Sequence, residues 1–313
     1  MKIEKAYSTI DVHVAGEAFR IIRNAPFIHY QSLKELYELF PQAYKEEQTL
    51  LLNEPRGFAG LNGCLVVPPL TREADAAVVF FNHDGTMPIH YGGMAAVVTA
   101  LLECGHLRER ASNQYLIETV GGVFPITAVM KGEEVVSVKM ESGFCEVMGT
   151  KECVTPSLAN HTLVQSDQVY AVFRTQDFPV EIQVEELADL RRWGQTVLPS
   201  LSPDVKGAIL VDESRIDEGH IRSITFRDDL LIVRSPGFGP TLAAFTSLLS
   251  SGSITNQVSL VNESIFGSQL QVQVLQQQES RFQYTMTCRG FITGMQTFIL
   301  DPTDPLAAGF ILK

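Results

Sequence analysis

Short stretches of alternating or continuous apolar residues dominate the chain, and helical spacing is rare. Alternation of apolar and polar positions predicts half-buried strands, and short continuous apolar runs predict strands buried on both faces. We expect strands at residues 10–14, 19–22, 65–67, 76–81, 115–119, 124–130, 135–140, 169–173, 208–211 and 230–233. Residues 269–287 predict a β-hairpin with a polar turn at 277–280, and we assign no function to its glutamines.

Two segments have the spacing of amphipathic helices. Ser32 can cap a helix that begins at the next residue and ends near Pro41. Residues 185–197 place apolar side chains at helical spacing and predict a second helix.

Two further helices, at residues 94–102 and 242–249, resemble each other. Each is apolar, rich in small residues, preceded by a glycine-rich turn and followed by a glycine. Either alone would be an ordinary core helix, but the same pattern in each half of the chain favours a duplicated α/β unit. Bare backbone N–H groups at a glycine-rich helix N-terminus can bind an anion. Two such sites across an inter-domain cleft would suit a small carboxylate.

Composition narrows the class of protein. A length of 313 residues suggests two domains of about 150 residues each. The net charge of −12, with no basic cluster, argues against nucleic acid or an anionic membrane surface as the main partner. Hydrophobic residues make up 45% and charged residues 19%, which excludes a disordered chain.

The five cysteines are odd in number, scattered and without clustered histidines. They predict neither a disulfide framework nor a zinc site, and they favour a reducing cytoplasm. The opening residues lack the apolar run of a signal peptide, and no apolar run approaches the roughly 18 residues needed to span a bilayer. We therefore expect a cytoplasmic protein with no membrane contact.

Several short motifs occur in a fixed order along almost the whole chain. They lie at residues 10–20, 54–57, 74–81, 234–236, 263–268, 289–294 and 301–310. The order resembles the proline racemase family, which includes hydroxyproline epimerases and trans-3-hydroxyproline dehydratases. Asp11, Glu17 and Arg20 match charged positions of its opening motif, I-D-x-H-x-G-G-E-x-x-R, and Arg56 lies in its E-P-R-G element.

The resemblance implies a mixed α/β fold like that of diaminopimelate epimerase. Two pseudo-symmetric halves would each wrap a mixed β-sheet around a central buried helix, with the active-site cleft between them. We expect residues 1–127 plus 290–313 to form the first half, which the final segment completes, and residues 128–289 to form the second. Members of the family work without a cofactor or metal and are commonly homodimers.

The family chemistry uses two cysteines on opposite faces of the substrate Cα, one as thiolate base and one as thiol acid. Both lie at the N-termini of the buried helices, whose dipoles favour thiolates. In this sequence the first thiol position is His90 and the second is Gly237. A glycine offers no acid or base, so we expect the two-thiol racemisation to be absent.

Other motif positions also differ from the family. Gly92 stands where the family has a histidine, Val233 where it has an aspartate, and Phe238-Gly239 where it has a Gly-Thr pair. Thr241 lies four residues beyond the second thiol position. We expect the substrate-binding residues to be Tyr91, Gly92, Gly93, Val233, Phe238, Gly239 and Thr241.

The cysteines do not fall on the two thiol positions. Cys104 lies at the far end of the first buried helix, and Cys64 and Cys288 fall where packing is the simpler interpretation. Cys145 and Cys153 flank a variable region, where we expect inert or solvent-facing side chains.

His90 has two interpretations. As a base, its imidazole would be kept neutral near pH 7 by the positive end of the helix dipole. Alternatively, it packs or forms hydrogen bonds in a degenerate site, since its usual family partners are changed. The sequence therefore supports three hypotheses. The first is one-base proton abstraction or dehydration of a small cyclic amino or imino acid. The others are non-catalytic binding of a small carboxylate and a structural or regulatory role.

Overall fold

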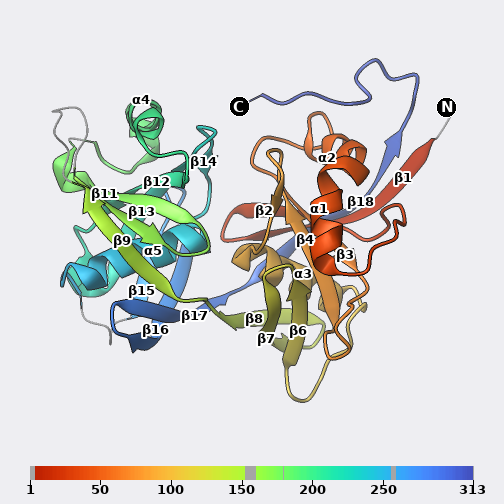
Figure 1. Cartoon of the computed structure of the whole chain (residues 1–313), viewed down its shortest axis with the longest axis horizontal. Helices are drawn as coiled ribbons and strands as arrows, with labels where there is room; N and C mark the ends of the chain where they lie inside the picture. The colour runs from red at the N-terminus through yellow and green to blue at the C-terminus, as the bar shows by residue number, and fades with distance from the viewer. Residues whose placement is uncertain (1–3, 152–159, 179, 255–258, 313) are drawn as a thin grey trace. The chain divides into compact units, whose positions relative to one another are not determined.

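A computed structural model describes residues 4–151, 160–178, 180–254 and 259–312. Its contacts divide the chain into two compact units, Met1–Met140 with Arg289–Lys313, and Glu141–Cys288 (Figure 1). The domain boundaries expected from the sequence, at 127/128 and 289/290, stay predictions.

The first unit contains one mixed β-sheet. Its strands are β1 (Lys5–Val14), β2 (Glu17–Ile22), β3 (Asn62–Val67), β4 (Ala76–Phe81), β5 (Thr86–Met87), β6 (Gln114–Thr119), β7 (Gly122–Lys131), β8 (Glu134–Glu141) and β18 (Gly290–Leu300). Along the series β18-β1-β2-β3-β4-β6-β7-β8, all neighbours pair antiparallel except β2–β3 and β4–β6, which are parallel. The strand nearest the C-terminus thus completes the first sheet, as expected from the resemblance.

The second unit repeats this order. Its strands are β9 (Cys145–Lys151), β10 (His161–Gln165), β11 (Val169–Arg174), β12 (Val205–Asp212), β13 (His220–Arg227), β14 (Ile232–Val233), β15 (Ser259–Glu263), β16 (Gln269–Gln278) and β17 (Arg281–Cys288). Along β9-β10-β11-β12-β13-β15-β16-β17, only β11–β12 and β13–β15 are parallel. The same succession of parallel and antiparallel pairs in both units confirms the prediction of two similar α/β halves.

Five α-helices accompany the sheets in the described residues. They are α1 (Leu33–Ala43), α2 (Lys45–Leu52), α3 (Tyr91–Glu103), α4 (Leu187–Val197) and α5 (Phe238–Ser250), with 3₁₀ turns η1 (Thr175–Asp177), η2 (Val184–Glu186), η3 (Leu198–Ser200) and η4 (Ile216–Glu218). Helix α3 contacts β1, β2, β3 and β18, and α5 contacts β9 to β12, β16 and β17. Each is therefore the central helix of its own sheet (Figure 1).

The two central helices are buried almost along their whole length, as expected. Every residue from Tyr91 to Leu102 and from Phe238 to Leu248 is buried. Both helices begin inside the glycine-rich turns, three to four residues earlier than the predicted starts at 94 and 242. Each ends at a left-handed glycine, Gly105 or Gly252, which the sequence had identified.

The opposite face of each sheet has its own apolar core. In the first unit, α1 and α2 bury Leu36, Phe40 and Leu50 against Phe81 of β4. In the second unit, α4 packs Trp193 edge-on against aromatic rings of the sheet. The architecture is thus layered in each unit, with a buried helix on one side of the sheet and amphipathic helices on the other.

Two predicted elements were wrong in extent. Helix α1 continues past Pro41 to Ala43, because Pro41 lies in the last turn and the N–H of Tyr44 still bonds to the carbonyl of Phe40 at 2.9 Å. The strand predicted at 230–233 shrinks to β14. Leu230 has a φ of 69° and closes a turn by donating its N–H to the carbonyl of Arg227.

A buried arginine joins several parts of the first unit. Arg20, 5% exposed, donates from Nε and Nη2 to the two oxygens of Asp11, at 2.9 and 2.6 Å. Its Nη1 donates to the carbonyl oxygens of Leu51 and Arg56, and its guanidinium lies 4.2 Å from the ring centre of Phe298. The interaction holds together β1, β2, the end of α2, the following loop and β18.

Arg56 extends this network toward the C-terminus. It donates to the carbonyls of Leu50 at 2.9 Å and Ala307 at 2.5 Å, and it lies 3.6 Å from the carboxylate of Asp304. Charged residues of three sequence motifs therefore meet in one structural cluster.

Replacing Arg20 with methionine leaves the Asp11 carboxylate largely buried without its partner. We expect the free energy of unfolding to fall by about 3–5 kcal/mol, because breaking one side of a buried ion pair strands the other charge. Urea unfolding followed by circular dichroism measures the loss. Lys34→Met breaks an exposed i,i+4 pair with Glu38 and is the control, with an expected change of about 0.5 kcal/mol or less. An equal effect of both changes would contradict the role given to Arg20.

Candidate functional site

His90 caps the N-terminus of the central helix α3. Its backbone is extended, and its Nδ1 accepts a hydrogen bond from the N–H of Gly93 at 3.2 Å. An Nδ1 that accepts has no hydrogen, so the neutral ring carries its hydrogen on Nε2. Nε2 lies 3.2 Å from Oε1 of Glu17. Both ring nitrogens are therefore engaged, one by the helix and one by a carboxylate.

Glu17 is the functional candidate that sequence reasoning missed. It begins β2 just after the β1–β2 turn, and its Oε1 also accepts from Nδ2 of Asn62 at 3.2 Å. Phe19 lies edge-on to the His90 ring, with ring centres 5.0 Å apart. The sequence marked Glu17 only as part of a family motif. Its place beside His90 comes from the sheet that brings the β1–β2 hairpin to the start of α3.

Glycines in the first turn of α3 let the surrounding side chains approach closely. A Cβ on Gly92 would lie 3.0 Å from the ring of Phe19 and 3.5 Å from Oε2 of Glu17. A Cβ on Gly93 would lie 2.7 Å from the ring of Phe80. Within the described part of the chain, the Gly92 N–H has no hydrogen-bond partner, whereas that of Gly93 is taken by His90.

The N-terminus of the second central helix, α5, differs from that of α3. Gly237 occupies the cap position with a φ of 66°, a conformation that L residues rarely adopt, and it has no capping side chain. Its N–H donates to Oγ of Ser235 at 3.0 Å. Position 237 therefore supplies no group that can take or give a proton.

A carboxylate from another segment lies against this helix N-terminus. Asp167, in the turn between β10 and β11, is so close that a Cβ on Gly239 would fall 1.9 Å from its Oδ1. The same Oδ1 accepts from Oγ of Ser166 and from the N–H of Gln168, both at 3.0 Å. The same Oγ lies 3.0 Å from the carbonyl oxygen of Gly239, so the single hydroxyl hydrogen of Ser166 is shared between these two acceptors. The absence of a side chain at position 239 is what makes room for Asp167.

The two helix N-termini thus share a local arrangement. In each, the second helical residue is a glycine, Gly92 or Gly239, and a carboxylate from the turn of a β-hairpin lies beside it, Glu17 or Asp167. The hairpins β1–β2 and β10–β11 occupy equivalent places in the two units. Carboxylates near helix N-termini are favourable because of the helix dipole.

The remaining predicted site residues vary in accessibility. Tyr91 and Phe238, the first residues of α3 and α5, are each 4% exposed, and Val233 is half-buried in β14. Thr241 is fully buried, and its hydroxyl accepts from Nδ2 of Asn262 at 2.9 Å. Their assignment to ligand binding stays a prediction.

The sequence matches one family of known proteins over almost its whole length. Residues 9–311 match the family described as Proline racemase. The chain belongs to the proline racemase family. It is 27% identical to a trans-3-hydroxy-L-proline dehydratase of Bacillus thuringiensis, over 100% of both chains. It is 25% identical to a 4-hydroxyproline 2-epimerase of Brucella anthropi, over 97% of this chain and 98% of that one.

A solved structure shows the same fold. The hydroxyproline epimerase of Agrobacterium vitis, solved with bound trans-4-hydroxy-L-proline, matches with a TM-score of 0.86 at 24% identity, over 100% of this chain and 96% of that one. The mixed α/β fold expected from the sequence is therefore confirmed.

Within the residues that the structure describes, no group of three or more His, Cys, Asp or Glu side chains is arranged to hold a metal ion. No described helix is long and apolar enough to cross a membrane.

Three of the described cysteines have thiols that resist ionisation. Burial raises the pKa of Cys145 to about 12 and that of Cys288 to about 12, and it raises the pKa of Cys64 further. Cys145 is 1% exposed, which excludes the solvent-facing alternative expected for it and leaves the inert one. Cys104 ends α3 at its far end, and Cys153 lies outside the described residues.

The raised pKa values predict inert thiols in the native protein. With a pKa of about 12, only about one thiol in ten thousand is a thiolate at pH 8, and thiolate is the reacting form. Ellman's reagent at pH 8, followed by peptide mass mapping, should leave Cys64, Cys145 and Cys288 unmodified until the chain is unfolded in urea. Modification of any of the three at the unfolded rate in native protein would contradict this.

Proposed function

We propose that this protein binds a small cyclic amino or imino acid, or a related carboxylate, and moves at most one proton on it. The Glu17–His90 pair would be the acid/base group. Membership of the proline racemase family supports the ligand class. The contact between His90 Nε2 and Glu17 Oε1, at 3.2 Å, is the observation that carries the proposal.

The pair can hold one exchangeable proton in two ways. Glu17 can accept a proton on its carboxylate while His90 remains neutral. Alternatively, His90 can accept it on Nδ1 once the bond from the Gly93 N–H opens, and the cation then faces the Glu17 carboxylate. The base can therefore be Glu17 as well as the His90 named from the sequence.

The equivalent position in the second unit favours one base over two. Gly237 has no side chain, and its left-handed φ would strain a cysteine placed there. Two-base inversion at Cα needs a proton donor and a proton acceptor on opposite faces of the substrate. One acid/base group suits exchange on one face, or elimination of a leaving group next to Cα.

Asp167 would recognise the nitrogen of the ligand. The family motif has an aspartate where this chain has Val233, and Asp167 brings a carboxylate to the same helix N-terminus from a different loop. A carboxylate there attracts a protonated nitrogen and repels a second carboxylate.

A non-catalytic role is the second candidate. It is favoured by the two engaged nitrogens of His90, because a ring that caps a helix and contacts a carboxylate has a structural reason to be there. In that case the protein would bind the same ligands without exchange. The predicted cytoplasmic location and homodimer are independent of this choice and stay predictions.

Exchange of the Cα hydrogen in D₂O tests the one-base proposal. Proline, trans-4-hydroxy-L-proline and trans-3-hydroxy-L-proline would be followed by NMR, with chiral chromatography in parallel. We expect at least one to exchange or eliminate without inversion. Glu17→Gln should slow this about 100-fold or more, because general acid–base groups contribute at that level. His90→Asn should slow it too, although asparagine retains the helix cap.

Glu46→Gln, at an exposed carboxylate of the same unit, is the matched control and should change nothing. Thermal-shift titration of the same compounds reports binding separately. Binding without exchange in the parent protein would establish the non-catalytic alternative. Exchange at parental rates in both Glu17→Gln and His90→Asn would remove the pair from the reaction.

Asp167→Asn tests recognition of the nitrogen. L-proline and cyclopentanecarboxylate share a ring and a carboxylate and differ in the nitrogen. We expect the parent protein to prefer proline and Asp167→Asn to lose about tenfold or more of that preference, since a charged hydrogen bond is removed. Asp217→Asn, at an exposed position of η4, is the control. An unchanged ratio of the two dissociation constants in Asp167→Asn would contradict the role of Asp167.

A further inference from the structure

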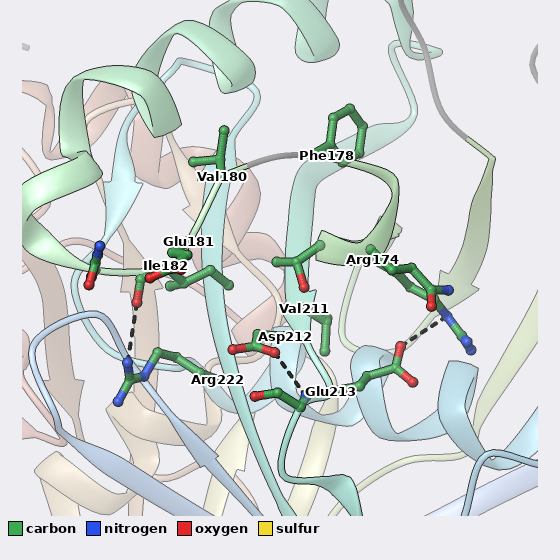
Figure 2. A pocket seen from close by; sticks show the side chains of 13 residues that line it. Arg174, Phe178, Val180, Glu181, Ile182, Val211, Asp212, Glu213 and Arg222 are labelled. Carbon is green, nitrogen blue, oxygen red and sulfur yellow. Dashed lines mark hydrogen bonds and ion pairs between the residues drawn. The ribbon is translucent and has the colours of Figure 1, made fainter.

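The second unit contains a cavity of about 810 Å³ away from the N-terminus of α5. It lies at the carboxyl ends of the parallel strands β11 and β12, beside the segment that leaves β11 (Figure 2). Ligands of α/β sheets commonly bind outside the carboxyl ends of parallel strands, and this volume is in the range of small-molecule sites.

One part of the cavity lining is apolar. Phe178, Val180, Ile182 and Val211 line it, from the segment after β11 and from the end of β12 (Figure 2). An aliphatic chain placed against these side chains would lose water from its surface and so bind favourably.

The two arginines of the lining are already paired. Arg174 lies with Nε 3.0 Å from Oε1 of Glu213 and donates from Nη2 to Oγ of Ser251 at 2.8 Å. Arg222 donates to a carboxylate oxygen of Glu263. It also donates to the carbonyl of Ile182 (Figure 2). Their charges are therefore compensated, and the cavity does not present two open anion sites.

The carboxylates of the lining outnumber these cations. Asp212 accepts the N–H of Ser214 at 2.8 Å, and neither Asp212 nor the exposed Glu181 has a cationic partner among the described residues. Glu213 forms an ion pair with Arg174, whose Nε lies 3.0 Å from Oε1. The angle of this contact is not that of a hydrogen bond, so the buried Oε1 has no hydrogen-bond partner among the described residues.

The raised pKa of the Glu213 carboxyl agrees with an excess of negative charge in the cavity. Desolvation raises the pKa of its carboxyl, Arg174 opposes this, and Asp212 and Asp177 add to the rise. A carboxyl whose pKa is raised by burial in a cavity is typical of a ligand-binding site.

We propose that this cavity binds a small organic cation, an aliphatic amine or guanidine whose chain lies on the apolar side and whose charged end meets Asp212, with Glu213 beside it. The proposal concerns a site separate from the Glu17–His90 pair and does not depend on the function proposed above.

The chain contains its own reporter for this cavity. Trp193 is its single tryptophan, and the ring lies edge-on to Phe178, with centres 5.6 Å apart. A ligand that packs against Phe178 should change the emission of Trp193. The same titration by calorimetry gives an independent measure of affinity.

Three compounds of equal chain length separate the possible ligand classes: cadaverine with two ammonium ends, pentanediol with neutral ends and glutarate with two carboxylates. We expect cadaverine to bind at least tenfold more tightly than the other two in the full chain. Tighter binding of glutarate, equal binding of all three, or no binding of cadaverine up to roughly 10 mM would overturn the proposal, since weaker binding falls below specific recognition.

Variants then locate the site. Asp212→Asn keeps an oxygen that can accept the Ser214 N–H, and it should weaken cadaverine binding at least tenfold. Glu218→Gln is the matched control. Glu218 lies on η4, pairs with Arg215 and is not part of the cavity lining, so its replacement should leave the affinity unchanged. Unchanged affinity in Asp212→Asn, with the parental thermal midpoint, would place the cation elsewhere and overturn the assignment.

Discussion

The buried guanidinium of Arg20 is the interaction on which the architecture of the first unit depends. It pairs with Asp11 across the β1–β2 hairpin and donates to two backbone carbonyls, one at the end of α2 and one in the loop that follows. A buried arginine is tolerable only when its donors are paired, so all these segments must be in place together. Asp11 and Arg20 of the opening motif therefore hold the hairpin that carries Glu17 toward α3.

The second constraint is close approach at the start of each central helix. Gly92 and Gly239 leave room where a side chain would collide with Phe19 or with Asp167. Neighbouring groups thus occupy the space that side chains at these two positions would need. Two helix N-termini that could hold an anion instead have carboxylates of the protein beside them. This arrangement favours a ligand with a donor or a positive charge over one recognised only by its carboxylate.

Much of the fold could be predicted from local pattern. Alternation and short apolar runs predicted most strands of the first unit and β11, β12, β16 and β17 of the second, but not β5, β9, β10, β13, β15 or β18. The central helices followed from apolar runs bounded by glycines. Local pattern failed where tertiary contacts decide. The start of α2 is mostly polar and does not have a helical apolar pattern, yet Leu50 and Leu51 anchor this helix in the core. Strand β18 pairs with β1 although nearly the whole chain separates them. The site residues stay predictions. Motif position placed His90 and Gly237 at the helix starts, whereas Glu17 lies beside His90 and Asp167 beside Gly239 only because hairpins fold over these starts.

By itself, the sequence determined the family, the repeated α/β organisation and the absence of a thiol at positions 90 and 237. These are properties of residue type and order, which a single chain displays directly. The tertiary structure decided what those positions do. It gave His90 a helix cap and a carboxylate partner, and it brought Asp167 against Gly239. It also enclosed a charged cavity at the ends of β11 and β12. The physical reason is that proximity between distant segments depends on strand pairing and packing, which no local spacing encodes.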